Sequence, residues 1–86
     1  MKNGIIGTEK GGYEKKDVLA KIDAFMALFK KMQNGISSAE AKETLIEISK
    51  MPLNEVDSDT EGFAKRDTNG YFSKLEYDTI SYFMKP

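Results

Sequence analysis

The sequence contains no cysteine and no histidine. Without cysteine, the chain can form neither a disulfide framework nor a thiolate metal site. Without histidine, it lacks the side chain on which most zinc sites, Ser-His triads and imidazole acid–base mechanisms depend. Any catalysis would have to rely on carboxylates, lysines or tyrosines. We therefore expect a protein that is not an enzyme.

Long apolar runs are also missing. The longest uncharged stretch, AFMALF at residues 24–29, is far shorter than the roughly 20 residues that a membrane-spanning helix requires. The first ten residues, MKNGIIGTEK, lack the apolar core of a signal peptide. These features predict a cytoplasmic protein, and the length of 86 residues predicts one small domain over 1–86.

The charge of the chain is nearly balanced but unevenly distributed. A net charge of −1 argues against a dedicated nucleic-acid binder. Residues 11–33 carry five lysines and three acids, a balance of +2, whereas residues 36–62 carry two lysines and seven acids, a balance of −5. Segments of opposite sign favour docking within the chain or head to tail between copies, although solvated faces alone would give the same distribution.

The segment GGYEKKDVLAKIDAFMALFKKMQ, residues 11–33, has the clearest helical pattern. Apolar residues recur there at intervals of four and three, which is the spacing of one face of an α-helix. The residues with this spacing are Val18, Ile22, Phe25, Phe29 and Met32. Leu19, Met26 and Leu28 widen the face to about half of the circumference, more than the ~100° that one neighbouring element covers. This helix, predicted over 11–35, therefore needs a large partner surface.

Both ends of this predicted helix carry residues that are typical of helix termini. Tyr13 can pack on Val18 as a hydrophobic staple, and Asp17 places an anion in the first turn, where the helix dipole favours it. Lysines occupy the last turns, and Asn34-Gly35 provides the stop. The charged residues at both ends have the signs that the dipole of a single helix favours.

A second helix is predicted over residues 37–51. Ser37 followed by Glu40 forms a capping box, which makes Ser37 the expected N-cap. Pro52 ends the helix, because the residue before a proline avoids the α region. The apolar face of this helix consists of Ala41, Leu45 and Ile48, with Ile46 beside it. The short connection between the helices predicts an antiparallel hairpin, in which the second helix is too narrow to cover the whole apolar face of the first.

A third, shorter helix is predicted over residues 73–84. Ser73 and Glu76 form a second capping box, and Phe72 and Tyr77 form a second staple. Because an isolated helix of this length is marginal in water, it needs a surface to pack against.

Two segments lack helical periodicity. Residues 52–71 are rich in acids, glycine and turn formers and predict a long loop. Ile5 and Ile6 predict a short extended piece or a loose terminus. The expected fold class is all-α: a long helix, an antiparallel second helix, a long loop and a short C-terminal helix, arranged as a three-helix bundle or as a helical-hairpin dimer.

Two short motifs resemble those of DivIVA-like proteins of Gram-positive bacteria. GGYEKKDVLAKIDAF is similar to the start of a DivIVA-like domain, where a glycine-aromatic pair introduces a long coiled-coil helix. FSKLEYDTISYF is similar to the second, shorter copy of the motif in DivIVA-like repeat proteins, with Glu76, Tyr77 and Asp78 at the positions of the acid and the apolar-Asp pair. The resemblance implies a bacterial scaffold protein that forms parallel coiled-coil dimers and organises cell division or cell poles.

The resemblance does not extend to membrane binding. Some members of the family bind membranes through an exposed aromatic and a basic residue in the turn just before the Gly-Tyr pair. This sequence has Lys10 and Gly11 there and no aromatic. Membrane insertion is therefore not expected.

The C-terminal segment also supports an alternative, a degenerate EF-hand-like calcium site over residues 65–76. The candidate ligands occupy positions 3, 5, 7, 9 and 12 of a calcium loop, and Gly70 occupies the turn position. These ligands are Asp67, Asn69, Tyr71, Ser73 and Glu76. Against this alternative, Lys65 stands where the first aspartate should be, and Gly62 interrupts the entering helix. Outside this alternative, the protein is expected to bind no cofactor.

The predicted function is a non-catalytic interaction or scaffold module. It would self-associate as a homodimer, or bind another helical protein, through the wide face of the first helix. The residues expected to carry this contact are Val18, Leu19, Ile22, Phe25, Met26, Phe29 and Met32. The competing expectation is that the third helix covers this face and closes a three-helix bundle. Aromatic residues near the C-terminus could stack on nucleic-acid bases, but the acids around them favour docking of the last helix on the first.

Overall fold

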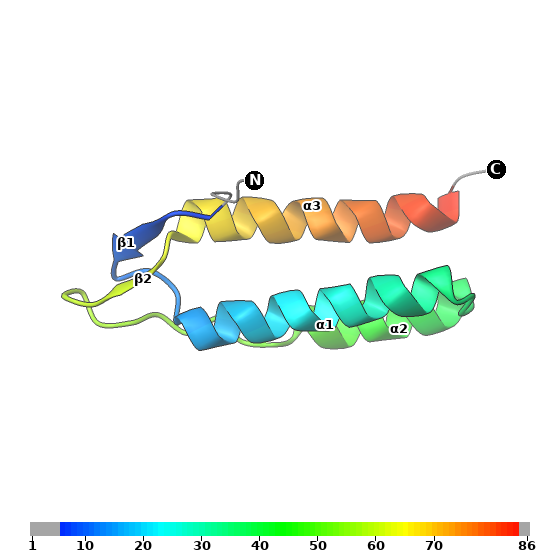
Figure 1. Ribbon diagram of the computed structural model, residues 1–86, viewed down its shortest axis with the longest axis horizontal. Coiled ribbons are helices and arrows are strands. Elements are labelled where there is room, and N and C mark those ends of the chain that lie inside the picture. Colours follow the sequence, from blue (N-terminus) through cyan, green and yellow to red (C-terminus); the bar gives the residue numbers. More distant parts are fainter. Residues whose placement is uncertain (1–5, 85–86) are drawn as a thin grey trace.

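The computed structural model describes residues 6–84. Within this range the chain forms, in order, strand β1 (Thr8–Lys10), helix α1 (Lys15–Gln33), helix α2 (Ser38–Ser49), strand β2 (Glu61–Phe63) and helix α3 (Lys65–Met84). The strands pair antiparallel, with Glu9 opposite Gly62, and lie at one end of the helices (Figure 1). The fold is mostly helical, as predicted, and the small sheet is an element that the sequence pattern did not indicate.

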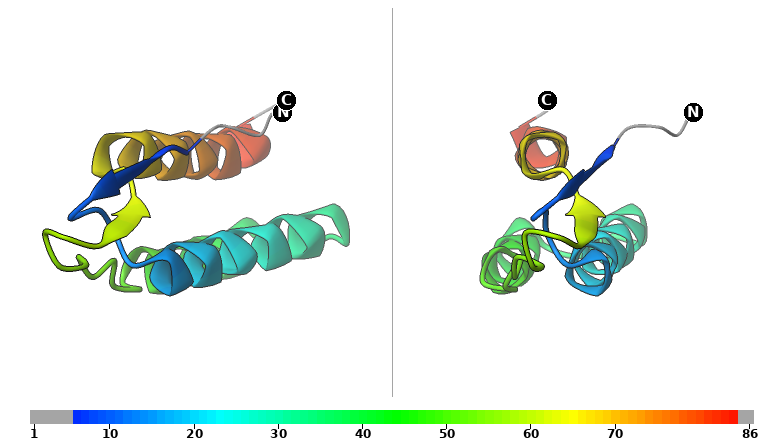
Figure 2. Two further views of the ribbon diagram at one scale, coloured as in Figure 1. Left: turned by 60° about the vertical axis from the view of Figure 1, so that its left-hand side comes forward. Right: turned by 90° about the vertical axis from the view of Figure 1, so that its left-hand side faces the viewer.

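The three helices surround one core. α1 and α2 form the predicted antiparallel hairpin, and α3 lies over this pair and runs in the same direction as α1 (Figures 1 and 2). All three helices contribute apolar side chains to the core. The buried members are Val18, Phe25, Leu28, Met32, Ala41, Ile48, Phe72 and Leu75. The hairpin and the C-terminal helix thus share one hydrophobic interior.

α1 begins at Lys15 and not at residue 11, because the residues before it pair with the β2 region. Tyr13 and Phe63 exchange two backbone hydrogen bonds, of 2.8 and 2.9 Å, and the amide of Gly11 donates to the carbonyl of Thr60 at 2.9 Å. Gly11 turns the chain here with a φ of +74°. The end of α1 is as predicted, with Asn34 as the C-cap and Gly35 at a φ of +98°.

α2 confirms its predicted start. The hydroxyl of Ser37 accepts a hydrogen bond from the amide of Glu40 at 3.1 Å, so Ser37 is the N-cap. The helix ends at Ser49 with Lys50 as the C-cap, slightly before the predicted end at residue 51 and just ahead of Pro52.

The predicted loop over 52–71 is wrong in its second half. β2 occupies Glu61–Phe63, and α3 starts directly after it at Lys65. The first half is irregular but tied to the start of α1, since the amide of Glu14 donates to the carbonyl of Asn54 at 2.7 Å. The carboxylate of Asp17 also accepts hydrogen bonds from the amide and the side chain of Asn54, at 3.0 and 2.9 Å. These contacts order a segment that has no periodicity of its own.

The predicted start of the third helix at residue 73 is also wrong. Ser73 lies in the middle of α3, so it is not an N-cap, and Tyr77 is 70% exposed, so it cannot form a staple with Phe72. The Ser-x-x-Glu pattern is compatible with a helix interior as well as with a helix start. The first turn of α3 forms further upstream, where the amide of Thr68 donates to the carbonyl of Ala64 at 2.9 Å.

The N-terminal apolar pair lies at the edge of the described range. Ile6 is half-buried and packs against the core, whereas Ile5 lies outside the described residues. Among residues 6–84, no helix combines the length and the apolar character that a bilayer-spanning segment needs.

Candidate interaction surface

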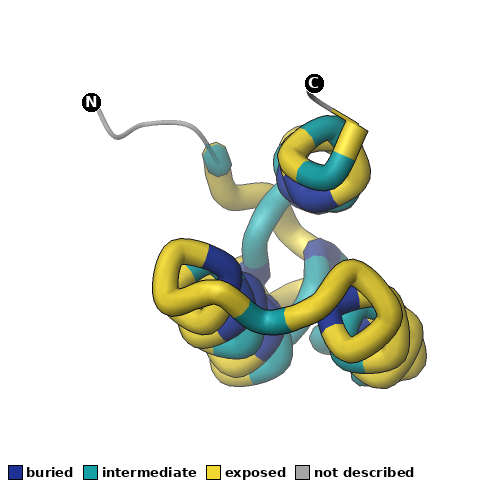
Figure 3. The backbone as a smooth tube through the Cα atoms, turned by 90° about the vertical axis from the view of Figure 1, so that its right-hand side faces the viewer, coloured by how far each residue is buried: buried dark blue, intermediate teal, exposed yellow. Residues whose placement is uncertain are grey.

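The wide apolar arc of α1 is divided between the core and the solvent. One side of the helix, formed by Val18, Phe25, Leu28 and Met32, is buried. The buried sides of the three helices face one another (Figure 3). Phe25 stacks on Phe72 of α3 at a centroid distance of 5.8 Å. The orientation that places these residues inside turns the rest of the apolar arc outward.

The outward part of the arc forms a continuous apolar line. Leu19 is 52% exposed and Met26 is 43% exposed, while Ile22 and Phe29, between and beyond them, are half-buried. The four residues are spaced at intervals of three, four and three, which is the a/d spacing of helices that pack against a partner helix. We name Leu19, Ile22, Met26 and Phe29 the α1 ridge.

The seven residues predicted to form the contact face therefore divide into two groups. Val18, Phe25 and Met32 are used within the chain itself, and they could meet a partner only if the fold opened. The other four make up the α1 ridge. α3 covers one side of the apolar face of α1, as expected for a three-helix bundle, and leaves the ridge uncovered. Self-association through this face stays a prediction.

Charged residues border the ridge at regular steps. Lys16, Asp23 and Lys30 are all exposed and stand seven residues apart on the solvent side of α1. A helix that packs on the ridge would meet these three charges along one edge, because residues seven apart lie nearly one above the other on a helix.

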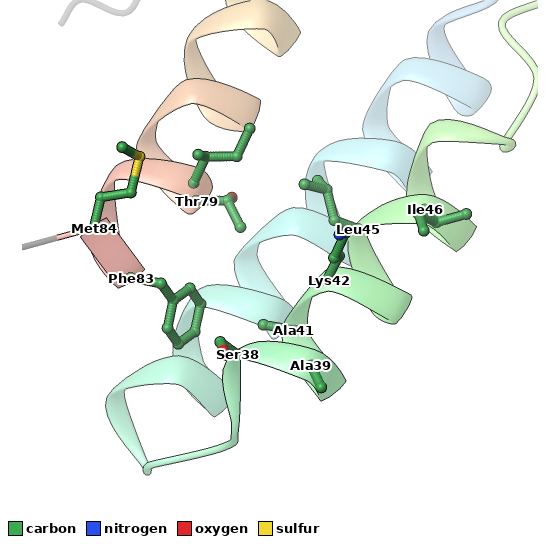
Figure 4. Close-up of a pocket in the computed structure, with 10 residues that line it drawn as sticks. Ser38, Ala39, Ala41, Lys42, Leu45, Ile46, Thr79, Phe83 and Met84 are labelled. Atoms are coloured by element: carbon green, nitrogen blue, oxygen red, sulfur yellow. The ribbon is translucent and has the colours of Figure 1, made fainter.

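A second apolar surface lies between α2 and α3. It is a groove of about 520 Å³ whose walls consist almost entirely of apolar atoms (Figure 4). We name it the α2–α3 groove. Its apolar walls are formed by Ala41, Leu45 and Ile46 of α2 and by Ile80, Phe83 and Met84 of α3. Ile80 is 52% exposed and Met84 is 76% exposed, so the groove is open to solvent.

The groove exists because α3 rests on α1 and not on α2. α3 is held to α1 by the Phe25–Phe72 stack near its middle and by the hydroxyl of Tyr82, which donates to the carbonyl of Met32 at 3.2 Å, near its end. No comparable aromatic stack or side-chain hydrogen bond joins α3 to α2 among the described residues. The apolar sides of α2 and α3 thus diverge toward the solvent.

Sequence reasoning did not find this groove, although two signals pointed to its walls. Ile46 falls outside the Ala41–Leu45–Ile48 face of α2, so it is an apolar residue without an expected position in the core. Ile80 and Met84 align on one side of the C-terminal helix. Neither pattern reveals that these apolar sides of α2 and α3 face each other across a groove, because that depends on where α3 docks.

The candidate calcium ligands do not form a loop. All five of them, Asp67, Asn69, Tyr71, Ser73 and Glu76, lie on α3, where successive side chains point about 100° apart. Two of them hold the N-terminal segment, since Asp67 accepts from the amide of Gly7 at 3.0 Å and Asn69 accepts from the hydroxyl of Tyr13 at 3.2 Å. Within residues 6–84, no three acidic side chains come together as metal ligands. The geometry that the EF-hand alternative requires is absent from this segment.

The C-terminal aromatics mostly serve packing. Phe72 is buried, Tyr71 and Phe83 pack against the core, and Phe72 joins α3 to α1 as predicted.

Comparison of the chain with protein-family models, with curated proteins and with solved structures finds no match. The surfaces described above are therefore the basis for a functional proposal.

Proposed function

We propose that this chain is a non-catalytic protein-interaction module that self-associates through the α1 ridge. The observation that carries the proposal is the exposure of Leu19 and Met26 on a line whose spacing suits a partner helix. Scattered exposed apolar residues are common on protein surfaces, whereas a contiguous apolar line marks an interaction site.

The ridge is short, which limits the strength of the contact. It spans residues 19–29, which is less than two heptads, whereas a coiled coil is generally recognised from three or four heptads. An interface of this size falls in the class of small, transient interfaces. We therefore expect association at micromolar to millimolar concentrations and not a permanent dimer.

The resemblance to DivIVA-like scaffold proteins supports this proposal through its first motif. In this chain Gly12 lies against β2, where a Cβ atom on it would come within 2.3 Å of the carbonyl oxygen of Phe63. Tyr13, next to it, pairs with Phe63 and packs against the core. The glycine-aromatic pair thus determines how the chain enters α1. The second motif lies inside α3 and does not begin a helix, so only the first motif supports the comparison.

Sedimentation velocity on two double variants tests the proposal. L19E/M26E places two charges on the ridge, where they would be desolvated in the complex. A20E/A27E places the same two charges on the same helix one residue further on, at exposed positions outside the ridge. We expect the ridge variant to sediment as a monomer at concentrations where the unmodified chain and the control variant associate.

Far-UV circular dichroism checks that both variants keep their helices. Equal association of L19E/M26E and the unmodified chain would contradict the proposal, and so would a monomeric unmodified chain at all concentrations. If the control variant were monomeric as well as the ridge variant, the added charge and not its position would prevent association, which would contradict a contact through the ridge.

A further inference from the structure

We propose that the α1 ridge of one copy docks in the α2–α3 groove of a second copy, so that the chains assemble head to tail. This inference rests on the proposed self-association and names the surface that receives the ridge. It differs from a symmetric contact in which two ridges meet each other.

The two surfaces have similar lengths. At about 1.5 Å per residue, the ridge from Leu19 to Phe29 is roughly 15 Å long, and the wall of the groove from Ser38 to Ile46 is roughly 12 Å long. The groove, of about 520 Å³, has room for apolar side chains of the ridge. Recognition of this kind, in which one face of a helix enters an apolar groove through residues three, four and seven apart, is a common mode of protein association.

One copy can use both surfaces at the same time. The groove is lined by Thr79, Ile80 and Phe83 on one side of α3. On the other side of α3, Asp78 and Tyr82 lie beside Phe29 of the ridge. No residue of the ridge lines the groove, so a copy that donates its ridge keeps its groove free for another.

Charge favours the ridge-in-groove contact. Of the described residues that line the groove, only Lys42 is charged. Asp23, the one acid among the charges that border the ridge, is available to meet it. On a larger scale, α1 carries five lysines and two aspartates, a balance of +3, and α2 carries three glutamates and one lysine, a balance of −2, so the two helices attract each other between copies.

An antiparallel symmetric contact between two ridges would bring like charges together. In a parallel two-fold pair, Lys16, Asp23 and Lys30 of the two copies would lie on opposite edges of the contact, so these charges would not pair across it. In an antiparallel pair centred on the ridge, Asp23 would face Asp23, and Lys16 would face Lys30. Like charges placed opposite each other disfavour the antiparallel contact, and the parallel contact gains nothing from these charges. The groove, where Asp23 can meet Lys42, therefore receives the second copy better.

A contact between two different surfaces does not close on itself unless the copies form a ring. Such heterologous contacts produce rings or open chains, whereas a symmetric contact stops at a dimer. We therefore expect the mass of the assembly to continue rising above that of a dimer as the concentration increases.

A mixing experiment tests the inference. The ridge variant L19E/M26E keeps an intact groove, and the groove variant I46E/I80E keeps an intact ridge; all four positions line their surface and none belongs to the buried core. We expect each variant alone to be monomeric and an equimolar mixture to form a one-to-one heterodimer and nothing larger, measured by sedimentation velocity. The control S49E/Y77E adds two charges to the same two helices outside the groove and should assemble like the unmodified chain.

The outcomes separate this inference from the proposal on which it rests. If the groove variant associates like the unmodified chain, or if the two variants do not pair, the groove is not the receiving surface, although self-association through the ridge stands. If the unmodified chain is monomeric throughout, both fail together. Should I46E/I80E lose its helical circular dichroism, I80S/M84S provides a milder groove variant at exposed positions, for which the same results are expected.

Discussion

The rings of Phe25 and Phe72 stack with their centroids 5.8 Å apart and their planes inclined by 23°. Both rings are buried, and they join α1 to α3 near the middle of each helix. This contact determines which side of α1 faces the core. It therefore also determines that Leu19 and Met26 face outward.

Truncation of either ring should destabilise the fold strongly. Phe25→Ala and Phe72→Ala each remove a buried aromatic side chain, and we expect each to lower the free energy of unfolding by about 3–5 kcal/mol. Urea denaturation followed by circular dichroism measures this loss. Tyr77→Ala, at a position that is 70% exposed on α3, should change the free energy by no more than about 0.5 kcal/mol. A small loss at Phe25 would show that the stack does not hold α3 in place.

Glycine substitutions distinguish a continuous α3 from a calcium loop. Gly70 lies within α3, and a Cβ atom there would meet no other atom within 4 Å. Gly70→Ala should therefore stabilise the protein by about 0.5–1 kcal/mol, because alanine favours the helix. In an EF-hand-like loop, the same glycine would be needed for the sharp turn, and alanine would destabilise it.

Gly12→Ala provides the contrast. Its Cβ atom would lie 2.3 Å from the backbone oxygen of Phe63, so the chain before α1 would have to move away from β2. We expect thermal unfolding to show a clear loss of stability in Gly12→Ala and a gain in Gly70→Ala. Equal effects at the two positions would contradict either the close approach of Gly12 to β2 or the open helical position of Gly70.

Two buried threonines of α3 should respond differently to replacement by valine. The hydroxyl of Thr68 is buried and has no hydrogen-bond partner among the described residues, whereas that of Thr79 donates to the carbonyl of Leu75 at 2.8 Å. Thr68→Val removes an unsatisfied polar group and should stabilise the protein by about 1 kcal/mol. Thr79→Val loses a hydrogen bond and should not stabilise it. Urea denaturation of the pair checks this, and a loss of stability in Thr68→Val would indicate that its hydroxyl has a partner.

The parts of the fold that depend on residues close together in the sequence could be predicted. Periodicity identified α1, and local capping patterns identified Ser37 as the N-cap of α2 and Gly35 as the stop of α1. β1 and β2 could not be predicted in this way, because each has only three residues and pairs with a partner about fifty residues away in the sequence. α3 starts two residues after β2, at Lys65, whose amide donates to the carboxylate of Glu9 in β1 at 3.2 Å.

The apolar face of α1 could be predicted from the sequence, but not which part of it is exposed. The spacing of apolar residues showed that α1 has more apolar surface than one helix can cover, and this is confirmed by the exposure of Leu19 and Met26 beside the buried Phe25. The spacing could not show how the arc divides between core and ridge. That division, like the groove between α2 and α3, depends on the docking of α3 on α1.

Self-association through the α1 ridge is tested most directly by methyl NMR of the methionines over a dilution series of the unmodified chain. Met26 lies on the ridge, Met84 lines the groove, and Met51 packs at the edge of the core outside both surfaces. Between about 10 µM and about 1 mM, we expect the Met26 resonance to move with concentration while that of Met51 stays in place. A Met26 resonance that does not move over this range, in a protein that remains folded, would contradict self-association through the ridge.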